Sequence, residues 1–559
     1  MTATTSTPMT LLTAQGEHVF PTLSAAQVER VAAHGRVRAV EAGDILVEAG
    51  ASNVPMFVVK SGTIEVVRVT DLGETLIVLY PAGQFTGEIN TLSGRRSLVR
   101  SRVGEPGEVI EVDRESMLGL VQSDSELSEI FMRAFILRRV EVIAHGFGDV
   151  VVIGSTHCSG SLRVREFLTR NGHPYASLDL DRDEGVQDLL DHFQVSAADV
   201  PIVIWRGQVV LRNPSNRAIA DCLGFNDAID EGHVRDLIIV GGGPSGLAAA
   251  VYAASEGIDV LVVEASSPGG QAGSSSRIEN YLGFPAGITG QELASRAYTQ
   301  SQKFGADIMI AKGATKLTCE RTPYAIEIDK LTKIPAKTVI IATGAEYRKL
   351  ALPDLSRFEG AGIYYGATFM EAQLCNGEEA IVVGGGNSAG QAAVFLAQSA
   401  KHVHMCIRSD GLVDTMSRYL IRRIEDSPKI TLHRHTELTE LDGGRRLEGV
   451  RWKNRQTGAE ENRPIRHVFV MAGAAPSTKW LDGCVTMDAK GFIRTGPDLT
   501  QEDLTAAKWP LARRPHLLET SLPGVFAVGD VRAGNVKRVA SAVGEGSIAV
   551  SFVHQVLHE

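Results

Sequence analysis

The stretch DLIIVGGGPSGLAAAVYAA at residues 236–254 joins a run of apolar residues to a glycine-rich turn and a run of small residues. Gly241, Gly243 and Gly246 have the spacing G-x-G-x-x-G, which lets a backbone approach a pyrophosphate at the beginning of a helix. The next apolar run, DVLVVE, ends in Glu264, 23 residues after Gly241, where a carboxylate is expected to accept hydrogen bonds from ribose hydroxyls. The pattern predicts a strand, a turn and a helix that bind a dinucleotide; an ordinary tight turn is the alternative. The predicted binding residues are Gly241, Gly243, Pro244, Ser245, Gly246 and Glu264.

A second stretch of the same kind, AIVVGGGNSAGQAAVFLAQ, occupies residues 380–398. Its turn reads G-x-G-x-x-A, and its second apolar run, HVHMCIR, ends in Arg408 instead of an acid. An acid repels a ribose 2′-phosphate, whereas arginine binds it through a charge-assisted hydrogen bond. The second copy therefore predicts NADPH over NADH, unless Arg408 is only a solvated charge at the end of a strand. The predicted binding residues are Gly384, Gly386, Asn387, Ser388, Ala389 and Arg408.

The two glycine triplets, which begin at residues 241 and 384, lie 143 residues apart. Each is followed further along the chain by an apolar run with a small-residue turn, IIATGA at 340–345 and FVMAGA at 469–474. This repetition predicts an internal duplication of an α/β Rossmann-like fold. The predicted units are a first dinucleotide domain in two parts, 233–350 and 475–559, and a second domain, 351–474, inserted between them.

The C-terminal half, about residues 233–559, resembles the low-molecular-weight thioredoxin reductases. The resemblance rests on blocks in the family's order: PGGQ, IENYLGFP, ATG, GGGNSA and PGVFAVGDVR. It implies that the first unit binds FAD, that the second binds NADPH and that the protein forms a homodimer. Carried over by position, it places these residues beside FAD: Gly270, Gln271, Asn280, Thr343, Gly344, Gly529, Asp530, Lys537, Arg538 and Val539.

One motif of the family is replaced. Where the family has Cys-Ala-Thr-Cys-Asp at the start of the NADPH unit, this chain has GATFM at 366–370. The Ala-Thr pair after aromatic residues keeps the frame, so the redox dithiol and its acid are absent. Electrons pass from reduced flavin to a disulfide through thiolate chemistry, which glycine and phenylalanine cannot perform. Cys375, six residues beyond Phe369, is expected to be a core residue.

Residues 149–226 alternate strands with helices and resemble a thioredoxin or glutaredoxin fold. The resemblance rests on the order strand, cysteine, helix and on Val200-Pro201 before an apolar strand, where the family has a cis-proline. The turn reads Cys-Ser-Gly-Ser from Cys158, and the beginning of a helix favours a thiolate. Cys158 is therefore the candidate catalytic residue, with Cys222 as a candidate resolving thiol. A docking domain without redox activity is the alternative.

The N-terminal part, residues 10–145, contains short alternating strands separated by glycines, which predicts a small β-barrel. With FTGEINTLSGRRSLV at 85–99 it resembles the cyclic-nucleotide-binding barrel. In that family a Gly-Glu pair begins a short helix, the glutamate binds a ribose hydroxyl and a later arginine pairs with the cyclic phosphate. An empty scaffold is the alternative, and no helix-turn-helix is expected after the barrel. The candidate effector-binding residues are Gly87, Glu88, Arg96 and Ser97.

The composition of the chain disfavours several classes of protein. The chain has 559 residues, with 56 Lys and Arg against 66 Asp and Glu, and this net charge of −10 disfavours a general nucleic-acid binder. Six cysteines without a Cys-x-x-Cys motif disfavour a disulfide scaffold and a zinc site. No stretch has about 18 unbroken apolar residues, and the first residues lack a secretory pattern. A cytoplasmic protein with reduced thiols and no membrane partner is expected.

These features together predict a multidomain flavoprotein oxidoreductase that takes hydride from NADPH onto FAD, with a cyclic nucleotide as a candidate effector. The electron acceptor is unknown. Three alternatives stay open: a disulfide reductase that relays electrons through Cys158, a reductase of ferredoxin, a quinone or oxygen, and a non-catalytic sensor of redox state or nucleotide. Turnover of NADPH with candidate acceptors separates them.

Overall fold

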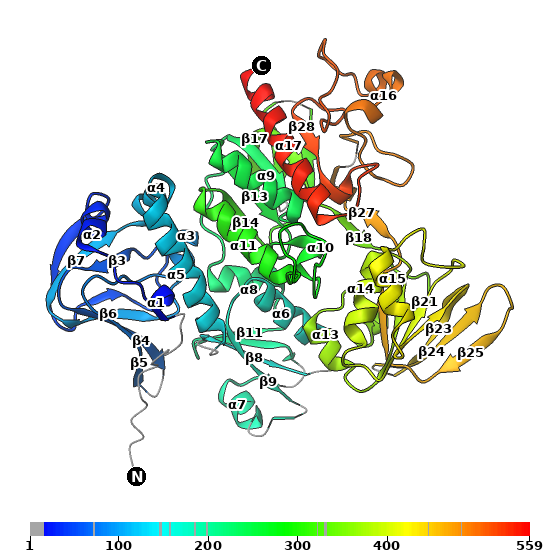
Figure 1. Cartoon of the computed structure of the whole chain (residues 1–559), viewed down its shortest axis with the longest axis horizontal. Helices are drawn as coiled ribbons and strands as arrows, with labels where there is room; N and C mark the ends of the chain where they lie inside the picture. The colour runs from blue at the N-terminus through cyan, green and yellow to red at the C-terminus, as the bar shows by residue number, and fades with distance from the viewer. Residues whose placement is uncertain are drawn as a thin grey trace.

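The structure is a computed structural model, and the protein is organised as four units in contact with one another (Figure 1). Residues 10–15 and 145 of the predicted barrel lie outside the described residues. The residues described are 16–70, 73–144, 148–155, 158–180, 182–183, 186–196, 199–320, 322–328, 332–444, 446–481 and 483–559.

The N-terminal unit is a β-barrel built from two antiparallel sheets with helices around them (Figure 1). The strand orders are β1-β7-β3 and β2-β6-β4-β5. Phe85 and Phe131 pack edge to face in the core with ring centroids 4.7 Å apart, so helix α5 is anchored to the barrel. The elements are α1 (Gly16–Val19), α2 (Ala25–Ala32), β1 (Arg36–Val40), β2 (Ile45–Val47), β3 (Met56–Val59), β4 (Thr63–Thr70), β5 (Gly73–Tyr80), α3 (Ile89–Ser93), β6 (Arg100–Glu105), β7 (Gly107–Val112), α4 (Arg114–Ser123) and α5 (Ser125–Ala144).

The middle unit has the strand and helix order expected of a thioredoxin-like fold. Its sheet has the order β11-β10-β8-β9, in which β8 and β9 are parallel and β10 is antiparallel to β8. The peptide bond between Val200 and Pro201 is cis, as the resemblance predicts. The elements are β8 (Val150–Gly154), α6 (Ser159–Arg170), β9 (Tyr175–Asp179), α7 (Val186–His192), β10 (Ile202–Trp205), β11 (Val209–Arg212) and α8 (Asn216–Leu223).

The first dinucleotide unit is a Rossmann-like α/β fold. Its parallel strands follow the order β14-β13-β12-β17, with β28 parallel to β17 and the antiparallel strands β16 and β15 beyond it. The strands are almost wholly apolar because both faces of the sheet are covered. The elements are β12 (Arg235–Val240), α9 (Pro244–Ser255), β13 (Val260–Glu264), α10 (Gly270–Gly273), α11 (Gly290–Lys303), β14 (Asp307–Ile310), β15 (Lys316–Thr318), β16 (Tyr324–Glu327), β17 (Lys333–Ile341), η3 (Gly496–Asp498), α16 (Gln501–Ala506), β28 (Val525–Ala527), η4 (Gly529–Val531) and α17 (Val539–His558).

The second dinucleotide unit repeats this fold, so the predicted duplication is confirmed. Its parallel sheet has the order β19-β26-β20-β21-β22, and the antiparallel strands β18 and β27 connect it to the first unit. The elements are β18 (Ala345–Tyr347), α12 (Leu355–Phe358), β19 (Ile363–Tyr364), α13 (Phe369–Leu374), β20 (Glu379–Val383), α14 (Asn387–Leu396), β21 (His402–Cys406), α15 (Arg418–Glu425), β22 (Ile430–His433), β23 (Thr436–Gly443), β24 (Leu447–Asn454), β25 (Glu460–Arg463), β26 (His467–Val470) and β27 (Ala474–Pro476). The short helix η2 (Lys479–Leu481) follows and packs in the core of the first unit.

The thioredoxin-like unit lies against both dinucleotide units. Its core continues into the first unit through Ile310 and Ala311. Leu162 of α6 packs against the core of the second unit, and Figure 1 shows α6 close to α13. Helices α3 and α4 of the barrel contact α11 of the first unit. The middle unit is therefore in contact with both dinucleotide units.

The expectation that all thiols are reduced is wrong for one pair. Cys319 and Cys484 form a disulfide although they are 165 residues apart in sequence. Their Cα atoms are 6.0 Å apart, a proximity that sequence spacing cannot reveal. The other four cysteines are free. Among the described helices, none is long and apolar enough to cross a membrane.

Candidate functional site

The first glycine turn lies between β12 and α9. Gly243 is the N-cap of α9 and no side chain caps this helix, so its first N–H groups are free to meet a ligand. A Cβ on Gly246 would lie 1.9 Å from the carbonyl oxygen of Gly241, which only glycine avoids. A Cβ on Gly243 would meet protein only at 3.9 Å, at Gly270. The turn is therefore tight against its own strand and open where a pyrophosphate would approach.

Glu264 is the last residue of β13 and is 9% exposed. Its carboxylate oxygens accept hydrogen bonds from the N–H groups of Gly242 and Ser266, at 2.7 and 2.8 Å. Burial raises the pKa of Glu264, and the two hydrogen bonds and the charge of Arg170 oppose that rise. The carboxylate is thus held beside the glycine turn, an arrangement that fits a dinucleotide ribose.

The C-terminal part of the unit forms a second wall of this site. The N–H of Gly529 donates to Glu545 at 2.7 Å, and a Cβ on Gly529 would lie 2.6 Å from Oγ of Ser245 on α9. Burial raises the pKa of Asp530, and the charge of Lys537 opposes the shift. Of the other predicted residues, Pro244 begins α9, Gly344 follows β17, Arg538 is the N-cap of α17 and Val539 is its first residue.

Three further predicted FAD residues lie in the loops of this unit. Nε2 of Gln271 donates to the carbonyl oxygen of Ala345, next to the strand that leads into the second unit. The hydroxyl of Thr343 donates to the carbonyl oxygen of Ser477 at 2.8 Å. Asn280 is exposed. Gln271 and Thr343 therefore bond to the two segments, at β18 and just after β27, that connect the two dinucleotide units.

The second glycine turn, between β20 and α14, repeats the first. Gly386 is the N-cap of α14 without a side-chain cap, and a Cβ there would meet nothing within 4 Å. A Cβ on Gly384 would lie 2.4 Å from the carbonyl oxygen of Met471. Arg408 follows β21, is exposed and makes no hydrogen bond or ion pair within the described part of the chain. Its charge is available to an incoming anion.

The first residues of α14 are fixed by neighbours. Oδ1 of Asn387 accepts the N–H of Ser417 at 2.7 Å, and Ala389 is fully buried. Ser388 hydrogen-bonds to Tyr347 of β18, where burial raises the pKa of the phenol and this bond opposes the rise. The glycine turn of the second unit is thereby tied to the strand that connects it to the first.

The segment at 366–370, where the family has its dithiol, contains the capped beginning of helix α13. The N–H of Thr368 donates to Oε2 of Glu371 at 2.8 Å, and α13 begins at the next residue. Glu371 is buried, and this burial raises its pKa. Sequence reasoning missed Glu371, although Thr368 followed three residues later by glutamate is a capping pattern. Cys375 is fully buried with its pKa raised to about 11, which confirms a core role.

Cys158 is the N-cap of α6 and is half-buried. A Cβ on Gly160 would lie 2.8 Å from Cδ of the cis-proline Pro201, so the proline faces the cysteine turn. A Cβ on Gly360 of the second dinucleotide unit would lie 2.5 Å from Cβ of Ser159. That unit therefore covers one side of the turn.

The candidate resolving thiol lies on another helix, α8. Cys222 is free, as is Cys158. Burial raises the pKa of Cys222, and the charge of Arg96 from the barrel opposes the rise. The structure therefore brings Cys222 near the barrel and Cys158 near the second dinucleotide unit, and it does not join the two thiols.

A cavity of about 110 Å³ lies in the barrel and is lined by Gly87, Glu88 and Ser97 together with apolar side chains and further polar ones, among them Arg138 and Glu141. Arg96 does not line it. Its Nη1 lies 3.4 Å from the carbonyl oxygen of Gly50, and its guanidinium lies 5.3 Å from the ring of Trp205. The phosphate-binding role of Arg96 stays a prediction, and it requires that Arg96 change partners.

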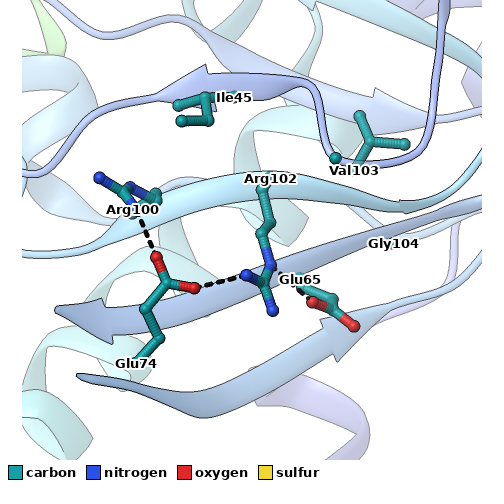
Figure 2. A pocket seen from close by; sticks show the side chains of 8 residues that line it. Ile45, Glu65, Glu74, Arg100, Arg102, Val103 and Gly104 are labelled. Atoms are coloured by element: carbon teal, nitrogen blue, oxygen red, sulfur yellow. Dashed lines mark hydrogen bonds and ion pairs between the residues drawn. The ribbon is translucent and has the colours of Figure 1, made fainter.

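A wider pocket on the barrel, about 320 Å³, is lined by charged side chains (Figure 2). Glu74 pairs with both Arg100 and Arg102, and Arg102 also pairs with Glu65 at 2.8 Å (Figure 2). Because each of these charges has an ionic partner, the pocket is a surface ion-pair network. It offers no unmatched charge to a ligand.

Known proteins resemble this chain in two regions. Residues 235–546 match the family described as "Pyridine nucleotide-disulphide oxidoreductase", and residues 37–124 match "Cyclic nucleotide-binding domain". The thioredoxin reductase of Ureaplasma parvum is 32% identical over 325 residues, 58% of this chain and 97% of that protein. "NADPH-dependent thioredoxin reductase 3" of Arabidopsis thaliana is 31% identical over 331 residues, 58% of each chain. The solved thioredoxin reductase of Lactococcus lactis has 27% identity, covers 58% of this chain and 100% of its own, and has a TM-score of 0.52.

The chain belongs to the pyridine nucleotide-disulphide oxidoreductase family and carries a cyclic-nucleotide-binding domain at its N-terminal side. It is a flavin oxidoreductase of the thioredoxin-reductase type, with FAD and NADPH as the cofactors of that type. The residues present fit both groups. Each glycine turn leaves open space at its middle glycine, the carboxylate of Glu264 lies where it would face the first ribose, and the unpaired charge of Arg408 would suit a 2′-phosphate.

Proposed function

We propose that the chain oxidises NADPH and passes the electrons to an acceptor other than a protein disulfide, such as a quinone, oxygen or a ferredoxin. The observation that carries this proposal is the replaced motif GATFM at 366–370. The nearest cysteine along the chain, Cys375, is fully buried and its pKa is raised to about 11. A thiol that is protonated and enclosed can neither attack a disulfide nor leave from one.

When bound, FAD supplies the electron relay of such an enzyme: it accepts a hydride from NADPH and returns the two electrons to an acceptor. The chain's own residues bind and orient the two dinucleotides. We assign the beginning of α9 and the carboxylate of Glu264 to FAD. We assign the beginning of α14 and the guanidinium of Arg408 to NADPH. We assign to the C-terminal side of the FAD site the remaining predicted residues, Gly529, Asp530, Lys537, Arg538 and Val539.

A relay through Cys158 is the competing function. The thiol lies at the N-cap of α6, a position that favours a thiolate, and cis-Pro201 faces the turn. However, Cys158 and Cys222 approach different units, so a single thiol would form a mixed disulfide with no partner to release it. We therefore assign the thioredoxin-like unit no electron transfer of its own.

The barrel is proposed to regulate this activity through a cyclic nucleotide. Gly87, Glu88 and Ser97 line its cavity, as the resemblance requires. Glu88 forms an ion pair with Arg139 at 3.4 Å, and Nη2 of Arg139 donates to the carbonyl oxygen of Gly172 in the thioredoxin-like unit at 2.5 Å. A ligand that hydrogen-bonds to Glu88 would compete with Arg139 for its carboxylate and would thus change the contact between the barrel and the thioredoxin-like unit. A homodimer in the cytoplasm is proposed from the resemblance alone, and light scattering tests the dimer.

The test is a screen of acceptors with the purified, FAD-loaded protein and NADPH. Quinones, ferricyanide, oxygen and ferredoxin are compared with thioredoxin and glutathione disulfide. We expect turnover with at least one acceptor of the first group, none at a useful rate with thioredoxin, and no effect of Cys158→Ser. Robust reduction of thioredoxin that Cys158→Ser abolishes would establish the relay instead. No oxidation of NADPH with any acceptor would favour a sensor.

A further inference from the structure

The C-terminal end of α6, residues 169–172, belongs to the thioredoxin-like unit but bonds to the first dinucleotide unit. Nη2 of Arg170 donates to the carbonyl oxygen of Gly270 at 2.7 Å. Nδ2 of Asn171 donates to Oγ of Ser267 at 2.9 Å, and both of these residues are buried. Because these bonds come from another unit, they exist only while the thioredoxin-like unit is docked.

The carbonyl group that Arg170 binds is part of the predicted FAD cradle. Gly270 has a φ of +53°, and a Cβ there would lie 3.0 Å from Cα of Gly243. The N–H of the preceding Gly269 donates to the carbonyl oxygen of Gly242 at 2.7 Å. The segment around Gly270 therefore lies directly against the glycine turn, and moving its carbonyl group would move the wall of the pyrophosphate site.

Arg170 also approaches the second predicted FAD group of this unit, the carboxylate of Glu264. The charge of Arg170 acts to lower the pKa of Glu264, against the larger effect of burial. The arginine side chain is 17% exposed, so water screens this attraction only weakly. One side chain of α6 thus holds the backbone of the cradle and favours the ionised form of its acid.

The barrel also binds the end of α6. Nη1 of Arg95 donates to the carbonyl oxygen of Asn171 at 3.1 Å, and Nη2 of Arg139 donates to that of Gly172 at 2.5 Å. Cations are favourable at the C-terminal end of a helix, where unpaired carbonyl groups gather. The end of α6 is fixed between the barrel and the cradle, so Arg170 is presented in one place.

We propose that Arg170, supported by Asn171, is a positioning residue of the FAD site that the thioredoxin-like unit supplies. The assignment rests on the proposed function, because it needs FAD at the first glycine turn. It gives the monothiol unit a role that does not use its thiol: the unit completes the wall of the cofactor site in the neighbouring unit.

The test measures FAD binding rather than turnover. Apoprotein is titrated with FAD, and the dissociation constant is read from flavin fluorescence. We expect Arg170→Ala to weaken FAD binding about tenfold, because it removes a charged hydrogen-bond donor. Arg170→Lys should recover part of that loss. At saturating FAD, the KM for NADPH should stay at the wild-type value, because Arg170 bonds to Gly270 of the first unit, whereas the predicted NADPH residues begin α14 in the second unit.

Two further variants serve as controls. Arg163 is on the same helix but donates to Oδ1 of Asn216 at 2.8 Å and to the carbonyl oxygen of Pro214 at 2.7 Å, within its own unit. Arg163→Ala should therefore leave FAD affinity unchanged. Ser267→Ala, on the FAD side of the contact, should weaken FAD binding in the same direction but less than Arg170→Ala.

The outcomes separate this assignment from the proposed function. If the wild-type protein takes up FAD and Arg170→Ala binds it equally well, the assignment is overturned and the proposed function stands. If Arg163→Ala weakens FAD binding as much as Arg170→Ala, the unit acts only through general stability, which also overturns it. A wild-type protein that takes up no FAD overturns both.

Discussion

The two glycine turns have the same backbone and opposite charges beside it. Each begins a helix without a side-chain cap, and each leaves open space at its middle glycine, Gly243 or Gly386. The second strand of the first unit ends in a buried carboxylate, Glu264, whereas that of the second unit is followed by the exposed Arg408. In the proposed assignment, backbone N–H groups would serve the pyrophosphate that both dinucleotides share, while one side chain would select the ribose substituent.

The largest effect should come from closing either turn. Gly243→Val places a branched side chain where the pyrophosphate approaches, so the purified protein should lose nearly all its flavin colour. Gly386→Val should leave the flavin in place and abolish NADPH oxidation. Flavin content from the visible spectrum and stopped-flow reduction by NADPH check the pair. Full flavin in Gly243→Val would show that FAD does not bind at the first turn.

The second largest effect should come from removing the positive charge of Arg408 in the second unit. Arg408→Ala should lower kcat/KM for NADPH by about 10- to 100-fold, because a charge-assisted hydrogen bond to phosphate contributes about 1.5–3 kcal/mol. NADH has no 2′-phosphate, so its kcat/KM should stay nearly constant and serves as the internal control. Equal losses with both nucleotides would mean that Arg408 does not read the phosphate.

The third effect concerns the buried acid of the first unit. Burial raises the pKa of Glu264 above its ordinary value. A raised folded-state pKa contributes stability at pH below the ordinary carboxyl range, and that stability is lost as pH rises through the folded-state pKa. Removing this group with Glu264→Gln should therefore flatten the fall in apoprotein stability with rising pH. The same variant should weaken FAD binding about tenfold, because it loses an ionised acceptor.

Urea unfolding of the apoprotein from pH 4 to pH 8 measures the slope for the wild type and for Glu264→Gln. Other titrating groups are common to both proteins, so the difference between the slopes belongs to Glu264. Arg408→Ala, at the matching position of the second unit, should leave the slope unchanged. Identical slopes in the wild type and Glu264→Gln would contradict a raised pKa.

The smallest effect concerns a third predicted phosphate site, the turn at Gly87 in the barrel. Cyclic AMP at about ten times its Kd stabilises by about 1.4 kcal/mol, which should raise the melting temperature by a few degrees. Arg96→Ala should abolish this rise, because binding requires Arg96 to leave Gly50 and Trp205 for the phosphate. Differential scanning fluorimetry checks both proteins. No rise at millimolar ligand would reduce the barrel to a scaffold.

Local requirements made much of the fold predictable. The glycines of the two turns are required by contacts within a few residues of chain or with the adjacent strand, so their spacing predicts the folds around them. The repeat at 241 and 384 then predicts the duplication. The direction of Arg96 was not predictable, because Trp205, which it stacks on, belongs to another unit. The capping pattern of Thr368 and Glu371 is readable in the sequence, but the burial of Glu371 is decided by packing.

The sequence by itself determined that the chain has two dinucleotide turns of different charge, a single-thiol turn at Cys158 and no dithiol at 366–370. These features depend on residue type and short spacing, which can be read directly from the sequence. Only the tertiary structure decided that Cys319 bonds to Cys484 and that Arg170 reaches Gly270, 100 residues further along. The physical reason is that such contacts arise from the packing of whole units, which brings together side chains that no local pattern relates.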